Sequence, residues 1–155
     1  MSLMLTLYLA GKISGLNYYD AVDWRDHVES QLMEYPVVCF SPMRGNNSLA
    51  KETVIEPDSV PQNTTSQELY ERGIADIKRA DIVLAYLPSL DSFGTAFELG
   101  QAKALDKFTI LVVKGKNQFH PYVQHGTARQ TNSLEQAIEA IQSLSETITP
   151  DFGES

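Results

Sequence analysis

The chain has 155 residues, of which 43% are hydrophobic and 21% charged, a composition typical of a single globular domain. Its formal net charge of −8 at pH 7 argues against a protein that binds duplex nucleic acid, because such proteins usually carry a basic face. We expect neither a membrane span nor a secretory signal, because no apolar run approaches ~18 residues and no basic residue precedes the apolar N-terminus.

Strand-like and helix-like patterns alternate in the first half of the chain. The apolar segment Leu5–Ala10 predicts a first strand, and the apolar face between Tyr18 and Met33 predicts a helix. Val37–Phe40 predicts a second strand. Residues 41–64 then show no regular pattern. Loops of this length in compact domains are often lids or binding segments, and disorder is the alternative.

The second half continues the alternation. Two nearly all-apolar runs predict strands that are buried on both faces, Ile82–Leu87 and Thr109–Val113. Three further helices are predicted, at about Ser66–Arg79, at Thr95–Leu105 and from Leu134 onward. Capping-box patterns precede the first and the last of them, Thr65 with Glu68 and Ser133 with Gln136.

Strands that alternate with helices imply a parallel sheet covered on both faces. We therefore predict an α/β fold, a three-layer, flavodoxin-like or Rossmann-type domain over residues 1–145, and a frayed polar tail at 146–155. Such sheets bind ligands beyond the carboxyl ends of their strands, near the point where the strand order reverses.

Glycine, serine, asparagine and charged residues follow each predicted strand, which makes these strand ends the candidate site. The candidates are Gly11, Ser14, Arg44, Asp91, Ser92, Gly94 and Asn117. Gly94 and Thr95, with Ser92, offer N–H and hydroxyl groups for an anion or a sugar, and simple N-capping is the alternative. Arg44 is a candidate clamp for a phosphate or base, or else a solvated arginine.

Glu98 is the candidate nucleophile. It lies in the first turns of the third helix, where the helix dipole favours the ionised carboxylate. A surface glutamate is the alternative, but the neighbouring Phe97, Leu99 and Ala102 leave little polar surface on this helix. Tyr8 closes the first strand, and we expect its hydroxyl to meet Glu98, unless it is simply a core aromatic.

Metal and disulfide chemistry have little support in the sequence. Cys39 is the only cysteine, so we expect no internal disulfide and a cytoplasmic location. His120 and His125 could bind a ligand, but two lone histidines make a poor metal site. We expect no metal and no other cofactor.

Four segments resemble the nucleoside 2-deoxyribosyltransferase family: Tyr8–Gly11, Ser41–Gly45, Asp76–Asp81 and, most specifically, Ser92–Gly100. The resemblance runs from about Leu5 to Leu144. It implies cleavage of the N-glycosidic bond of a nucleoside or nucleotide, with Glu98 attacking the anomeric carbon and Tyr8 orienting it. A branch of this family that hydrolyses nucleoside 5′-monophosphates has a serine six residues before the glutamate, and Ser92 matches it.

The chain departs from the family pattern at Gly73. Many relatives carry an arginine–aspartate pair at this place, where the aspartate helps handle the base, and this chain has Arg72 and Gly73. Asp76 and Asp91 are the nearby candidates to replace that aspartate. Asp76 is expected to point elsewhere from its helix.

The resemblance also implies partners. The ligand would be a small nucleoside or nucleotide, with no nucleic-acid polymer and no membrane. A homodimer or higher homo-oligomer is implied, in which a neighbouring subunit completes the pocket through Asn117–His125. Two other functions stay open: a non-catalytic nucleotide or nucleotide-sugar binder, which Gly73 favours, and a flavodoxin-like protein that binds a phosphate-bearing cofactor such as a flavin.

Overall fold

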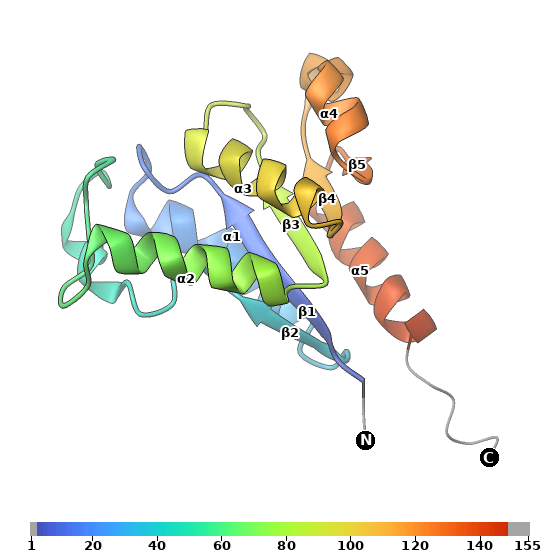
Figure 1. The fold of residues 1–155 in the computed structure, drawn as a ribbon, viewed down its shortest axis with the longest axis horizontal. Helices are drawn as coiled ribbons and strands as arrows, with labels where there is room; N and C mark the ends of the chain where they lie inside the picture. The colour runs from blue at the N-terminus through green and yellow to red at the C-terminus, as the bar shows by residue number, and fades with distance from the viewer. Residues whose placement is uncertain (1–2, 149–155) are drawn as a thin grey trace.

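The computed structural model describes residues 3–148 and forms one parallel sheet of five strands in the order β2-β1-β3-β4-β5 (Figure 1). The strands are β1 (Leu5–Gly11), β2 (Val37–Phe40), β3 (Ile82–Tyr86), β4 (Phe108–Val112) and β5 (Arg129–Thr131). The α-helices are α1 (Tyr18–Gln31), α2 (Ser66–Arg79), α3 (Phe93–Ala104), α4 (Pro121–Gly126) and α5 (Leu134–Ile148). Two 3₁₀ helices, η1 (Asn47–Lys51) and η2 (Gly115–Phe119), lie in the loops.

Helices cover both faces of the sheet, which confirms the predicted three-layer α/β fold (Figure 1). Side chains alternate between the faces along a strand, so Leu7 and Leu9 of β1 pack with α1 and α5. Tyr8 and Ala10 point to the other face and pack with α2 and α3. This alternation directs the Tyr8 phenol toward the helix that carries Glu98.

The strand order reverses at β1, which lies between β2 and β3. The chain passes from β1 through α1 to β2 at one edge, and then returns through α2 to β3 on the other side of β1. A crevice is expected beyond the carboxyl ends of β1 and β3 in such a sheet. The loops after these strands, together with α2 and α3, therefore bound the candidate site.

Several element boundaries differ from the sequence-based expectation. Helix α3 begins at Phe93, two residues before the predicted start, because Ser92 serves as its N-cap. Helix α5 continues to Ile148, three residues into the segment predicted to fray, and residues 149–155 of that segment lie outside the described chain. The short β5 and α4 were not predicted, because neither is long enough to show a periodic apolar pattern.

No helix within residues 3–148 has both the length and the apolar character needed to cross a bilayer.

The long segment 41–64 is folded against α1. Met43, Leu49 and Ile55 form a small apolar cluster with Ala21. Ile55 also exchanges two backbone hydrogen bonds with the loop after β1: Gly15 N donates to Ile55 O at 2.7 Å, and Ile55 N donates to Leu16 O at 2.7 Å. Gly15 has a φ of +86°, a conformation that favours glycine. The segment is therefore folded rather than disordered, and it forms one side of the candidate site.

Candidate active site

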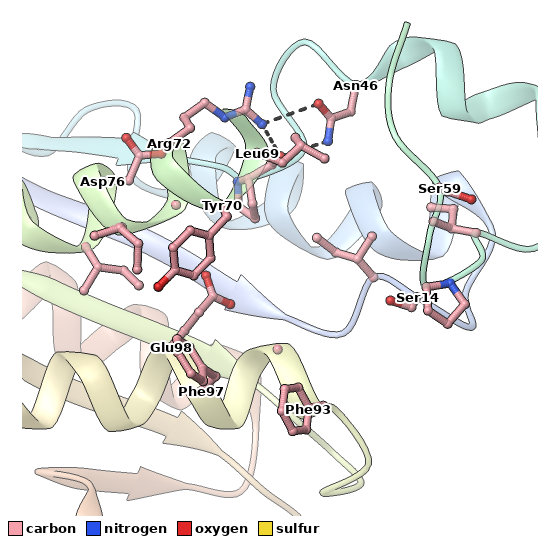
Figure 2. A pocket seen from close by; sticks show the side chains of 18 of the residues that line it. Ser14, Asn46, Ser59, Leu69, Tyr70, Arg72, Asp76, Phe93, Phe97 and Glu98 are labelled. Carbon is pink, nitrogen blue, oxygen red and sulfur yellow. Dashed lines mark hydrogen bonds between the residues drawn. The ribbon is translucent and has the colours of Figure 1, made fainter. Parts of the chain in front are cut away.

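A cavity of about 410 Å³ lies between α2, α3, the end of β1 and the folded segment 41–64 (Figure 2). Its volume falls within the range of small-molecule sites. Five of the residues predicted from the sequence line it: Tyr8, Ser14, Asp76, Gly94 and Glu98. Figure 2 shows Glu98 on α3 facing the α2 side of the cavity, where Arg72 and Asp76 lie.

Tyr8 and Glu98 are joined by a short hydrogen bond, in which the phenol hydroxyl donates to Glu98 Oε2. The expected contact between these two side chains is therefore confirmed. Tyr8 is 1% exposed. Burial, followed by the negative charge of Glu98, raises the pKa of the Tyr8 hydroxyl, so that the phenol stays protonated and acts as a donor.

Burial raises the pKa of Glu98 above its usual 4.5. The hydrogen bond from Tyr8 and the positive charge of Arg25 act in the opposite direction, and the charge of Asp76 adds to the rise. The sequence predicted a carboxylate whose ionised form is favoured by the helix dipole. Glu98 is the sixth residue of α3, beyond the first turn in which the dipole acts most strongly, so desolvation decides the direction.

Arg25 is a buried cation that interacts with this pair, and it was not among the site residues predicted from the sequence. It is 1% exposed and donates to Leu9 O at 3.1 Å, to Gly11 O at 3.0 Å and to Ala21 O. Burial lowers its pKa to about 10, so it remains charged at neutral pH. A signal was present in the sequence, because Arg25 shares the apolar face of α1 with Ala21 and Val28.

Helix α2 holds the first part of the folded segment 41–64 in place. Arg72 donates to Pro42 O at 2.7 Å and to Arg44 O at 3.1 Å, and it also reaches Asn46 (Figure 2). Asp76 forms ion pairs with Arg44 at 2.7 Å and with Arg79 at 2.8 Å. The predicted ligand clamp Arg44 is therefore engaged with Asp76 and does not line the cavity.

Gly73 lies in α2 and lines the cavity beside the Tyr8–Glu98 pair. A Cβ atom at this position would lie 3.9 Å from the Tyr8 hydroxyl, which is ordinary van der Waals contact. Asp76 lies one turn further along α2 and also lines the cavity, which corrects the expectation that it points elsewhere. Its carboxylate forms ion pairs with two arginines, so it does not replace a carboxylate at position 73.

Asp91, predicted as a catalytic group, lies away from Glu98. It pairs with Lys12 at the edge of a second cavity of about 260 Å³. Hydrogen bonds from Lys12 and Ser89 lower the pKa of Asp91 to about 2, which leaves no proton for it to donate at neutral pH.

Four other predicted ligand contacts do not line the main cavity. Gly11 packs on Trp24, where an added Cβ would come within 2.6 Å of the indole ring. Ser92 caps α3 by accepting from Thr95 N at 3.3 Å. Asn117 donates to Pro88 O at 3.4 Å, and His120 accepts from Tyr122 N at the start of α4. Within residues 3–148 no group of three or more histidine, cysteine or acidic side chains is placed to hold a metal ion.

Replacing Glu98 with glutamine should stabilise the protein at neutral pH. Because the folded-state pKa of Glu98 is raised, its protonated form stabilises the fold fully below pH 4.5, and this contribution is lost as the pH rises through the folded-state pKa. Glu98→Gln keeps a neutral group at every pH. We expect its melting temperature at pH 7 to exceed that of the wild type by about 2–4 °C, which corresponds to ~1 kcal/mol for a domain of this size.

Differential scanning calorimetry between pH 4 and pH 8 checks this expectation. The difference between the two proteins should shrink toward pH 4.5. Glu139→Gln, at an exposed position on α5, is the matched control and should show no such trend. A Glu98→Gln variant that melts at or below the wild-type temperature at pH 7 would contradict the burial argument.

Comparisons with known proteins show the family and the fold of the chain. The family model described as nucleoside 2-deoxyribosyltransferase matches residues 7–151. No curated protein matches the chain in sequence. Among solved structures, the chain resembles a 2-deoxyribosyltransferase from Bacillus psychrosaccharolyticus, with a TM-score of 0.62 and 18% identity over 96% of this chain and 94% of that one.

Two further structures share the fold. A 2-deoxyribosyltransferase from Leishmania mexicana has a TM-score of 0.59 and 18% identity over 90% of this chain and 97% of that one. The CMP N-glycosidase BcmB from Clostridium botulinum has a TM-score of 0.58 and 15% identity over 90% and 98%. Since the family model covers nearly the whole chain, the protein belongs to the nucleoside 2-deoxyribosyltransferase family.

Proposed function

We propose that this protein cleaves the N-glycosidic bond of a nucleoside or nucleoside 5′-monophosphate, with Glu98 as the nucleophile. Its family membership supports N-glycosyl transfer or cleavage as the general reaction. The observation that carries the specific proposal is the hydrogen bond between Tyr8 and Glu98 inside a cavity of substrate size. A glutamate on the solvent-facing side of a helix would be neither desolvated nor hydrogen-bonded to a buried phenol.

The reaction proceeds as two displacements at the anomeric carbon. A Glu98 oxygen forms a bond to C1′ while the bond from C1′ to the base nitrogen breaks, and the base leaves with a proton supplied by an acid. Water or a second base then attacks C1′, the ester bond to Glu98 breaks, and the attacking group loses its proton. Both steps pass through an oxocarbenium-like state that the adjacent negative charge stabilises, as in retaining glycosidases.

Tyr8 has two roles in this scheme. Its hydroxyl donates to Glu98 Oε2 and so fixes the orientation of the carboxylate, which leaves Oε1 for attack. The same hydrogen bond lowers the pKa of Glu98 against the effect of burial, which increases the ionised fraction. A partly desolvated, ionised carboxylate is the reactive form of such a nucleophile.

The end of the cavity near the start of α3 suits a 5′-phosphate. Ser14 and Gly94 line this end. The first N–H groups of a helix have no intrahelical acceptor, and the positive end of the helix dipole favours an anion there. A phosphorylated substrate is therefore the preferred form of the proposal.

A non-catalytic nucleotide or nucleotide-sugar binder is the second candidate, and Gly73 is the observation that favours it. Without a carboxylate at position 73, α2 offers no evident proton donor for the base. Ligands that raise the melting temperature without any base release would support this alternative. Turnover that depends on Glu98 would exclude it.

Removing the Glu98 carboxylate should slow base release strongly. We expect Glu98→Ala to lower the rate by about a hundredfold or more, because several kcal/mol of barrier stabilisation are lost. The measurement is chromatographic release of free base from a panel of nucleosides and 5′-monophosphates, with and without a second base. Glu139→Ala on α5 is the control and should retain wild-type rates. Base release by the Glu98 variant at the wild-type rate would overturn the assignment.

Removing the Tyr8 hydroxyl should move the acid limb of the pH–rate profile to higher pH. Activity requires ionised Glu98, so kcat/KM rises with pH through the raised pKa of that group. Tyr8→Phe deletes the hydrogen bond that lowers this pKa. The profile should shift upward, and kcat should fall about tenfold or more. The control Tyr35→Phe removes a phenol hydroxyl just before β2, at the amino ends of the strands, and should leave the acid limb where it is in the wild type. An acid limb that does not move in Tyr8→Phe would refute the proposed effect of Tyr8 on the pKa of Glu98.

We also propose a homo-oligomer as the working form, as the sequence resemblance implies, and an exposed aromatic segment could form the contact between subunits. Phe119 is 64% exposed and Tyr122 82% exposed, both beyond the carboxyl end of β4. We expect sedimentation velocity at micromolar concentration to give a dimer or larger species. Tyr122→Asp should shift the protein toward the monomer. A wild-type protein that sediments as a monomer at these concentrations would reject the proposal.

A further inference from the structure

Three aromatic side chains on the wall of the main cavity are open to solvent. Phe93 is 89% exposed, Tyr70 56% and Phe97 49%, and all three line the cavity. Exposed apolar side chains are normal when they are scattered singly. A group of them beside a cavity marks a place where a ligand or a partner binds. The proposed reaction has so far given these rings no role.

Tyr70 and Phe97 are in contact between the two helices that bound the cavity. Tyr70 belongs to α2 and Phe97 to α3, and their ring centroids lie 6.4 Å apart with an interplanar angle of 58°. Figure 2 shows the Tyr70 side chain projecting from α2 toward Glu98 and Phe97 on α3. The two rings thus meet at a corner beside the carboxylate, and each keeps about half of its surface exposed.

The direction of attack determines where the base of a substrate would lie. This step rests on the proposed function. The base is bonded to C1′, the atom that Glu98 attacks, and a displacement places the leaving group on the far side of that carbon from the nucleophile. Because Glu98 on α3 faces the α2 side of the cavity, the base would lie toward α2 (Figure 2). Tyr70 is the aromatic side chain that α2 contributes to this wall.

The rest of the α2 wall offers a base little polar recognition. Three of its cavity-lining side chains are apolar: Leu69, Ile74 and Ile77. Arg72 is bonded to carbonyl oxygens of the segment 41–64, and Asp76 is paired with two arginines. An aromatic ring binds a base by stacking, which every base can do because every base has a π-face. This wall therefore suits a planar base without selecting among hydrogen-bonding edges.

We propose that the Tyr70 ring, at the corner that it forms with Phe97, stacks on the base of a bound nucleoside or nucleoside 5′-monophosphate. Gly73, one turn after Tyr70 on α2, leaves space beside the stacked ring. A second copy of the chain is the other occupant to consider. The exposed rings line a cavity of about 410 Å³, a volume that suits a small molecule rather than the surface of a subunit.

Two substitutions at Tyr70 test the proposal. Tyr70→Phe keeps the ring and removes the hydroxyl, whereas Tyr70→Leu removes the ring and keeps an apolar side chain. Both are made in the Glu98→Gln background, in which calorimetric titration measures binding without turnover. The ligands are the cytidine, uridine, adenosine and guanosine 5′-monophosphates, each as the ribo and the 2′-deoxy form. Ribose 5-phosphate, which has no base, is measured by competition with the tightest of them. Tyr19→Leu, at an exposed tyrosine of α1 that does not line the cavity, is the matched control.

Tyr70→Leu should bind every monophosphate that the parent binds about tenfold or more weakly, as the loss of one stacked ring predicts. Tyr70→Phe and Tyr19→Leu should bind within a few-fold of the parent, and ribose 5-phosphate should compete equally well in all of them. An equal loss for ribose 5-phosphate, or a loss of the same size in Tyr70→Phe, would overturn the proposal, because contact between ring and base would not explain it. Unchanged nucleotide affinity in Tyr70→Leu, or no nucleotide binding by the parent, would also overturn it.

Two further measurements separate this inference from a subunit contact and from the proposed reaction. Tyr70→Leu should sediment and melt like the parent, whereas a shift to a smaller species would assign the ring to an interface between copies and overturn the proposal. If the wild type releases no base but nucleotide binding depends on the Tyr70 ring, the reaction fails and the inference stands. If base release depends on Glu98 but Tyr70→Leu binds nucleotides as tightly as the parent, the inference fails alone.

Discussion

The hydrogen bond between Tyr8 and Glu98 is the constraint on which the rest of the site depends. It joins an inner strand of the sheet to a helix on one face, and its Tyr8 side is buried while Glu98 is partly exposed to the cavity. A carboxylate in such a place is costly to ionise unless it has partners. Tyr8 and Arg25 lower that cost, Asp76 increases it, and burial determines the net direction. The result is a carboxylate that is poorly solvated and fixed in orientation.

Arg25 links this electrostatic balance to the shape of the sheet edge. Its guanidinium binds the carbonyl oxygens of Leu9 and Gly11, which belong to the carboxyl end of β1, just beyond Tyr8. The strand end is therefore fixed by the same cation that favours ionised Glu98. Gly11 allows this approach, since any side chain there would overlap the Trp24 ring that also lies against the guanidinium. Its place in the sequence motif is explained by packing rather than by ligand contact.

A feature of this structure could be predicted from the sequence when it depends on neighbouring residues, and not when it depends on contacts between distant segments. Strands β1, β3 and β4 are continuous apolar runs, because both of their faces are covered. The Tyr8–Glu98 contact follows from side-chain alternation in a strand and from the family resemblance. The pairing of Ile55 with Gly15 joins segments forty residues apart, and no local pattern in the chain indicates it. The place of Arg25 on the apolar face of α1 is visible in the sequence, but its acceptors are backbone carbonyls, which no residue pattern indicates.

Gly73 leaves space in the cavity beside Tyr8 and Glu98. A glycine inside a helix costs about 1 kcal/mol relative to alanine. Its φ is not positive, so the backbone conformation does not require it, and an added Cβ would fit against Tyr8 at 3.9 Å. What the glycine provides is space, because a longer side chain would fill the region beside Tyr8 and Glu98. With Asp76 held by two arginines, α2 contributes space rather than an acid, so the proposed reaction would need its proton donor from another part of the cavity wall or from solvent.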